Sequence, residues 1–119
     1  MNEPASGQLQ ILDVDVQTAD QEAGAGAILL DVREQQEWDA GHAPQALHVP
    51  LSSVDAAALP PGPVLAICRS GNRSGVAAQQ LADAGVDVRN VAGGMLAWAE
   101  AGLPMATSGP HAEDEPAVV

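Results

Sequence analysis

The apolar residues of the chain fall into short continuous runs that are separated by segments of mixed polarity. The two clearest runs, residues 27–32 and 64–67, have the length of strands and are apolar at nearly every position. Such runs are typical of strands that are buried on both faces of a parallel sheet. The same pattern predicts further short strands at residues 9–12, 46–49 and 86–91.

Segments with helical character lie between these strands. They are predicted at residues 16–22, 33–40, 75–84 and 95–101, with a helical turn that ends at Leu59. The residues expected to cap or stop these segments are Asp13 or Asp15, Ser52 or Ser53, Gly41 and Gly85. Strands that alternate with short helices indicate an α/β domain with a mainly parallel sheet.

The residues that follow the run at 64–67 carry the clearest functional pattern. Cys68, the one cysteine of the chain, ends this strand, and a polar loop then leads through Ser74 into the alanine-rich helix. Active groups of parallel α/β sheets lie at the carboxyl ends of the strands. Helix N-termini and consecutive backbone N–H groups attract anions, and a thiol placed there ionises easily. The segment therefore predicts a thiolate nucleophile that acts on an anionic substrate.

Length and composition fit one domain. The chain has 119 residues, of which 46% are hydrophobic, and its aromatic residues are two tryptophans, Trp38 and Trp98, which are expected to fill the core. No run approaches the ~18 apolar residues of a membrane span, and the N-terminus lacks the features of a signal peptide, so a cytoplasmic location is expected. We expect a lead-in at residues 1–8, a domain at 9–104 and an acidic, disordered tail at 105–119.

The net charge and its distribution limit the kinds of molecule that the protein is expected to bind. The net charge is −12, with no lysine and four arginines, so nucleic acid and anionic membranes are poor partners. Residues 56–82 contain no acidic residue and hold Arg69 and Arg73, which favours a small anionic substrate at this place. A single cysteine excludes an internal disulfide and requires an external acceptor for any group that Cys68 collects. No metal site or cofactor is indicated.

The interval between Cys68 and Arg73 separates two chemistries. The loop of protein tyrosine phosphatases is similar but has one residue more between its cysteine and arginine, which makes room for a phosphate. Here four residues intervene, and this tighter ring is better suited to enclose one extra sulfur atom.

The loop at residues 68–74, Cys-Arg-Ser-Gly-Asn-Arg-Ser, resembles the active-site loop of the rhodanese family of sulfurtransferases. Three other segments agree with this family in the expected order: Leu-Asp-Val-Arg-Glu at 30–34, Glu-Trp with Gly-His, Pro and Ala at 37–46, and Asn-Val-Ala-Gly-Gly with a tryptophan at 90–98. Ala43 and Gln45 replace the isoleucine and glycine that are usual in the family's turn, a departure that affects local packing.

The resemblance implies a rhodanese-like fold with a central five-stranded sheet and helices on both faces. It implies that Cys68 takes sulfane sulfur from thiosulfate or a persulfide donor and passes it from a persulfide to cyanide, a cellular thiol or a protein. The loop residues expected to bind the substrate are Arg69, Ser70, Gly71, Asn72 and Arg73. The residues expected to support them are Asp31, Arg33 and Ser74.

Other interpretations stay open at this point. Ser70, Asn72 and Ser74 have the alternative role of shaping the turn and capping the helix. Asp31 and Arg33 are better explained as a structural ion pair than as catalytic groups, and His42 as part of a turn. The whole domain could instead be a sulfur relay or regulatory module for a dedicated protein partner, and a phosphatase or arsenate reductase is less favoured.

Overall fold

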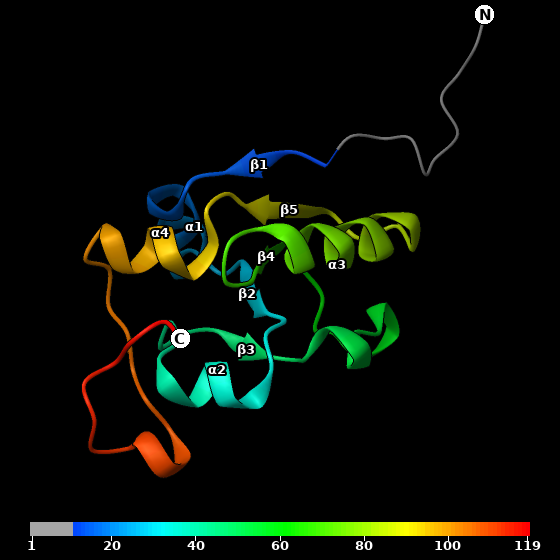
Figure 1. Cartoon of the computed structure of the whole chain (residues 1–119). Coiled ribbons are helices and arrows are strands. Elements are labelled where there is room, and N and C mark those ends of the chain that lie inside the picture. The colour runs from blue at the N-terminus through cyan, green and yellow to red at the C-terminus, as the bar shows by residue number, and fades with distance from the viewer. Residues whose placement is uncertain (1–10) are drawn as a thin grey trace, which may run out of the picture.

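The computed structural model describes residues 11–119, which form a sheet with helices on both of its faces (Figure 1). In chain order, with η for a 3-10 helix, the elements are β1 (Asp13–Val14), α1 (Val16–Gly24), β2 (Ile28–Asp31), α2 (Gln35–Ala40), β3 (Leu47–His48), η2 (Leu51–Ser53), η3 (Ala56–Ala58), β4 (Val64–Ile67), α3 (Asn72–Asp83), β5 (Val88–Val91), α4 (Gly94–Glu100) and η4 (Gly109–His111). None of the helices in this part of the chain is long and apolar enough to cross a membrane.

The sheet has five strands in the order β1-β5-β4-β2-β3, and every neighbouring pair is parallel. The four residues of β4 lie at its centre and are all buried, as their uninterrupted apolar sequence predicts. This arrangement confirms the predicted α/β class and the five-stranded parallel sheet.

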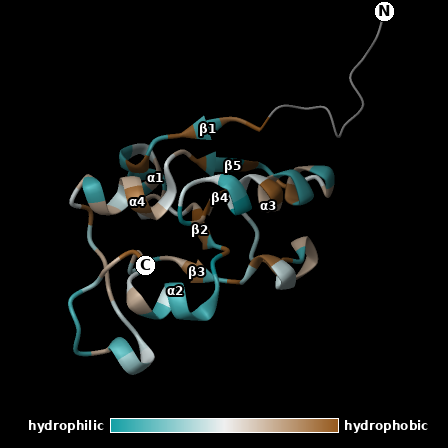
Figure 2. Cartoon of the chain, viewed as in Figure 1, coloured by the Kyte–Doolittle hydropathy of each residue, from teal (hydrophilic) through white to brown (hydrophobic). Residues whose placement is uncertain are grey.

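Alternate residues of β4 divide the core between the two faces of the sheet. Leu65 and Ile67 pack with residues of α1 and α4 in one cluster, which includes the fully buried Trp98. Val64, Ala66 and Cys68 point the other way and pack with residues of α3. Successive side chains of a strand point to opposite faces, so Cys68 is placed on the α3 face by its register alone. Figure 2 shows the hydrophobic strands β2 and β4 inside and a hydrophilic outer surface on α2.

Three features differ from the prediction by more than a shift of one or two residues at the end of an element. The first strand is β1 and not residues 9–12: Ile11 and Leu12 precede it, and residues 9 and 10 lie outside the described residues. Helix α3 begins three residues before the predicted start, because Gly71 (φ +113°) takes a left-handed conformation that turns the chain directly into the helix. Asp55, rather than a serine, caps the helical turn at η3 through the amide of Ala57.

The C-terminal segment also differs from the prediction of a disordered tail. Its Ala106 exchanges two backbone hydrogen bonds with His42, and the amide of Ala117 donates to the Ala40 carbonyl at 2.8 Å. Val118 packs against the core on the α1 and α4 side. Residues 105–119 thus lie along α2, and Figure 1 shows the C-terminus beside β3 and α2.

Gly41 makes room for this segment. A Cβ at Gly41 would lie 2.5 Å from the Ala117 carbonyl oxygen and 2.7 Å from the Met105 Cε. The backbone of Gly41 is extended (φ 172°), so alanine is compatible with its conformation and conflicts only with the segment packed against it.

We therefore expect Gly41→Ala to displace residues 105–119 and to lower the free energy of unfolding by roughly 1–3 kcal/mol, the usual range for overpacking. Hydrogen exchange should become faster at the amides of Ala106 and Ala117, which are bonded to α2 and the residues after it. Gly24→Ala is the control, since nothing lies within 4 Å of a Cβ at Gly24. Unchanged exchange in Gly41→Ala would contradict this account of the segment.

Candidate active site

The predicted loop lies at the carboxyl end of β4, where the chain passes from the centre of the sheet into α3. Cys68 is the first residue after β4 and is only 1% exposed. Its Sγ accepts a hydrogen bond from the Gly71 amide at 3.1 Å and lies 3.2 Å from the Ser74 hydroxyl oxygen. The loop therefore curls around the sulfur atom, as the sequence predicts.

Two opposing effects set the protonation of the thiol. Burial raises the pKa of Cys68, because an ion loses water there. Hydrogen bonds from the Ser74 hydroxyl and from the amides of Ser74, Gly71 and Ser70 stabilise the thiolate and lower the pKa. The hydrogen bonds together outweigh burial, so the pKa of the Cys68 thiol lies below its ordinary value. This is the direction that a sulfur nucleophile requires.

Helix α4 holds the loop from its other side. The Met95 amide donates to the Cys68 carbonyl at 2.8 Å, and the Leu96 amide donates to the Arg69 carbonyl at 3.1 Å. A Cβ at Gly94 would lie 2.6 Å from the Arg69 carbonyl oxygen, so this close approach requires glycine. The first two carbonyls of the loop are thus bonded to α4, while amides further along the loop face the sulfur.

Asn90, at the third position of β5, is a site residue that the sequence analysis did not identify. Its Oδ1 lies 2.6 Å from the Ser74 hydroxyl oxygen, and its Nδ2 donates to the Gly71 carbonyl at 3.3 Å. The Asn90 amide therefore contacts both loop residues that bond to Sγ. Asparagine is disfavoured in strands, and this polar position in an otherwise strand-like segment was the sequence feature that could have indicated it.

The two arginines of the loop have partners elsewhere in the chain. Arg73 donates to both carboxylate oxygens of Glu37, at 2.7 and 2.8 Å. Arg69 is exposed, and its Nε donates to the backbone oxygen of Val119 at 3.1 Å. Residues 56–82 contain no acidic residue in the sequence. In the folded protein, however, α2 brings the carboxylate of Glu37 to Arg73.

The ion pair between Arg73 and Glu37 shifts the pKa of both side chains. Its hydrogen bonds lower the pKa of Glu37 to about 2, against an ordinary value of 4.5. They raise the pKa of Arg73, and the charge of the Cys68 thiolate raises it further. Arg73 is therefore a fixed positive charge that interacts electrostatically with the Cys68 thiolate, although its hydrogen bonds go to Glu37.

A fully buried ion pair connects β2 to α2. Arg33 donates to both oxygens of Asp31, with a shortest distance of 2.7 Å, and neither side chain is exposed. Its remaining donors reach the carbonyls of Gly41 at 2.8 Å and Glu37 at 3.2 Å. Asp31 and Arg33 thus form the structural ion pair that the sequence favours, and they hold the helix that carries Glu37.

Trp38 is not in the core, contrary to the prediction. Its ring stacks with those of His42 and His48, with centroids 3.6 and 4.7 Å away. Nδ1 of His42 bonds to the Trp38 carbonyl and Nε2 of His48 to the Arg33 carbonyl, each at 2.7 Å. Both imidazole rings are therefore held in place by hydrogen bonds to backbone carbonyls. Among the described residues, no group of three histidine, cysteine or carboxylate side chains is placed to hold a metal ion.

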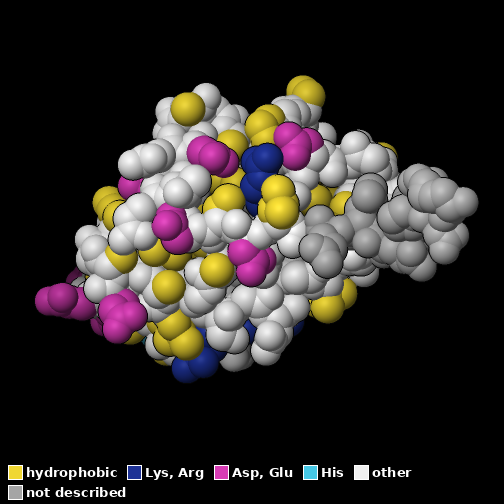
Figure 3. Space-filling view, turned by 90° about the horizontal axis from the view of Figure 1, so that it is seen from above, with side chains coloured by type: hydrophobic (Ala, Val, Ile, Leu, Met, Phe, Trp, Pro, Cys, Tyr) yellow, Lys and Arg dark blue, Asp and Glu magenta, His cyan; other side chains and the backbone are white. Residues whose placement is uncertain are grey.

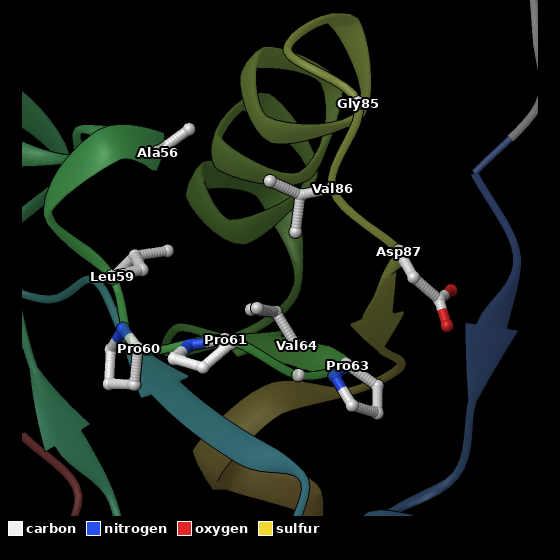
Figure 4. Close-up of a pocket in the computed structure, with 10 residues that line it drawn as sticks. Ala56, Leu59, Pro60, Pro61, Pro63, Val64, Gly85, Val86 and Asp87 are labelled. Atoms are coloured by element: carbon white, nitrogen blue, oxygen red, sulfur yellow. The ribbon is translucent and has the colours of Figure 1, made fainter.

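A hollow of the described surface lies at the opposite end of the sheet. It encloses about 470 Å³ between the residues before β4 and those before β5, and Val64, Val86 and Asp87 line it (Figure 4). Cys68 follows the far end of β4, so this hollow is separate from the loop. Figure 3 shows scattered acidic side chains with hydrophobic side chains between them on the face seen from above.

The replacement Glu37→Gln should reduce stability in a pH-dependent way. The low pKa of Glu37 stabilises the fold at pH values above about 4.5, and this contribution is lost as the pH falls towards about 2. For this partly exposed pair we expect a loss of about 1 kcal/mol at pH 7, which fades over the same interval in urea unfolding experiments. Glu100→Gln, at an exposed position, is the control, and a loss that persists at pH 2 would contradict the assignment.

Comparison with known proteins agrees with this geometry. The family model described as the rhodanese-like domain matches residues 7–101. A protein of Arabidopsis thaliana named thiosulfate sulfurtransferase 18 is 34% identical, over 90% of this chain and 89% of its own. An uncharacterized protein of Synechocystis sp. is 44% identical over 65% of this chain, which spans less than half (45%) of that relative's length.

A solved structure agrees as well. The crystal structure of a rhodanese-related protein from Thermoplasma volcanium superimposes with a TM-score of 0.73 and 27% identity, over 82% of this chain and 99% of that one. The family match covers the loop, the residues that hold it and all five strands. The chain therefore belongs to the rhodanese-like domain family.

Proposed function

We propose that this protein is a sulfurtransferase that carries a sulfane sulfur on Cys68. The observation that carries the proposal is the environment of Sγ: a buried thiol whose pKa is lowered by hydrogen bonds from the loop, in a chain of the rhodanese-like family. The name of the Arabidopsis relative, thiosulfate sulfurtransferase 18, suggests thiosulfate as the first donor to test.

The first half of the reaction loads the cysteine. The Cys68 thiolate attacks the outer sulfur of thiosulfate and forms a sulfur–sulfur bond. The bond from that outer sulfur to the sulfonate sulfur breaks, and its electron pair leaves with sulfite. The product is a Cys68 persulfide whose negative charge lies on the outer sulfur, where amides of the loop are expected to stabilise it.

The second half of the reaction transfers the outer sulfur from the Cys68 persulfide to an acceptor. A nucleophilic acceptor attacks the outer sulfur, and the electron pair of the sulfur–sulfur bond returns to Sγ, so the thiolate is regenerated. The chain contains no second cysteine, so the acceptor comes from outside: cyanide, a small thiol or a protein. A low thiol pKa helps this step also, because a more stable thiolate is a better leaving group.

Arg69 is the residue best placed to receive an anionic donor. Its side chain is exposed and its Nε is bonded to a single backbone oxygen, so an anion can replace that partner at little cost. Arg73 is bonded to a carboxylate through two nitrogens and contributes through its charge. We expect Arg69 to contact the donor and Arg73 to attract it.

Mass spectrometry of the intact protein tests the proposal. Incubation with thiosulfate should add one sulfur atom to the wild-type protein, and peptide mapping should place it on Cys68. Cys68→Ser should keep the melting temperature to within a few degrees, gain no sulfur and lose transfer to cyanide. Turnover of an aryl phosphate by a wild-type protein that gains no sulfur would overturn the proposal.

A further inference from the structure

The hydroxyl group of Ser74 has one proton and two acceptors within reach. Its oxygen lies 2.6 Å from Oδ1 of Asn90 and 3.2 Å from Sγ of Cys68, and Ser74 is fully buried. A serine hydroxyl donates one hydrogen bond at a time. The two contacts are therefore alternatives, and the shorter of them goes to Asn90.

The Asn90 amide is oriented so that it always offers an acceptor to Ser74. Its Nδ2 donates to the Gly71 carbonyl and to Oδ1 of Asp13, both at 3.3 Å. A rotation of the amide by half a turn would place Oδ1 against those two oxygens, so it is disfavoured. Oδ1 of Asn90 therefore competes with Sγ for the Ser74 proton at every stage of the reaction.

We propose that Asn90 is a positioning residue that takes the Ser74 hydrogen bond whenever Sγ carries no charge. On the proposed sulfur transfer, which this inference builds upon, the hydroxyl alternates between Asn90 and Cys68 once in each half of the reaction.

Each stage has one arrangement of hydrogen bonds. In the thiol form the Cys68 S–H donates to the Ser74 oxygen, whose own proton goes to Asn90. In the thiolate form the Ser74 proton goes to Sγ, because hydrogen bonds to ions are roughly twice as strong as those between neutral groups. In the persulfide the charge lies on the outer sulfur, and the hydroxyl returns to Asn90. When an acceptor removes the outer sulfur, the electron pair returns to Sγ and the hydroxyl follows it.

This alternation lowers the cost of the attack. A thiolate stabilised by hydrogen bonds must give some of them up as it forms a bond, and a buried hydroxyl left without a partner costs free energy. With Asn90 in place, the Ser74 hydroxyl exchanges one acceptor for another during the attack. Asn90 thus allows a low thiol pKa to coexist with a reactive thiolate.

Charged groups from several elements face this site. Arg69 and Arg73 lie on the loop and the start of α3, Glu37 on α2 pairs with Arg73, and Asp13 on β1 bonds to Asn90. Replacements at Ser74 and Asn90 leave all four in the chain. Because these charged groups are present in all four proteins compared below, their influence on the thiol pKa largely cancels in the comparison.

The test is a double-mutant cycle of wild type, Ser74→Ala, Asn90→Leu and the double variant, read out as the thiol pKa from the pH dependence of alkylation by iodoacetamide. Leucine resembles asparagine in size, offers no acceptor and keeps water from replacing it. We expect Asn90→Leu alone to lower the thiol pKa. We expect Ser74→Ala to raise it, and by more in the Asn90→Leu background than in the wild type. An equal or smaller rise in that background would overturn the inference.

Asn90→Asp is the matched control, since it keeps an acceptor towards Ser74 while its charge raises the thiol pKa. In this background Ser74→Ala should raise the pKa by no more than it does in the wild type; a rise as large as in the Asn90→Leu background would overturn the inference. If Asn90→Leu does not fold, Asn90→Ala removes the same acceptor and is expected to show the same sign.

A rate measurement separates this inference from the proposed function. Above the thiol pKa, sulfur loading of Asn90→Leu should slow by about threefold for each unit by which its pKa has fallen, because the nucleophilicity of thiolates decreases with their basicity. A loading rate that does not fall would overturn the proposed role in the attack. Alkylation requires no sulfur transfer, so the coupling between Ser74 and Asn90 stands or fails independently of whether thiosulfate loads Cys68.

Discussion

The chemistry of this protein depends on the direction in which the peptide groups after β4 are turned. The carbonyls of Cys68 and Arg69 are bonded to amides of α4, whereas the amide of Gly71 faces Sγ. A loop in which those carbonyls faced the sulfur would repel a thiolate, and burial alone would raise its pKa. Two helices thus cooperate at one atom: α3 begins beside the sulfur, and α4 fixes the backbone that leads to it.

A series of contacts between charged side chains connects the sheet to Arg73 beside the nucleophile. The buried Asp31 binds Arg33, which bonds to carbonyls of α2 and the residue that ends it, and α2 presents Glu37 to Arg73. Removing one partner of a buried ion pair leaves an uncompensated charge, so Asp31 and Arg33 have to be retained or lost together. The side chains that look like candidates for acid–base catalysis in the sequence therefore determine where the arginine next to the nucleophile is held.

The sequence predicts best what is local to β4. An uninterrupted apolar run, a single cysteine and a polar loop are sufficient to place the nucleophile at the end of a central strand. Contacts between distant segments could not be predicted: nothing near Arg73 indicates Glu37, and nothing near Ser74 indicates Asn90. The C-terminal segment has two prolines, one glycine and a cluster of three acidic residues, which predicts disorder, but Val118 packs against the core. Composition measures the average character of such a segment and misses one apolar residue that binds.

The stacking of Trp38 gives this protein a useful optical property. The chain has no tyrosine or phenylalanine, so its two tryptophans account for all of its aromatic fluorescence. Trp98 is fully buried in the core, whereas Trp38 lies on α2, the helix that carries Glu37, and stacks with the imidazole rings of His42 and His48. One emitter therefore reports the integrity of the core, and the other reports the position of α2. Movements of the segment that holds Arg73 can be followed in solution without an attached label.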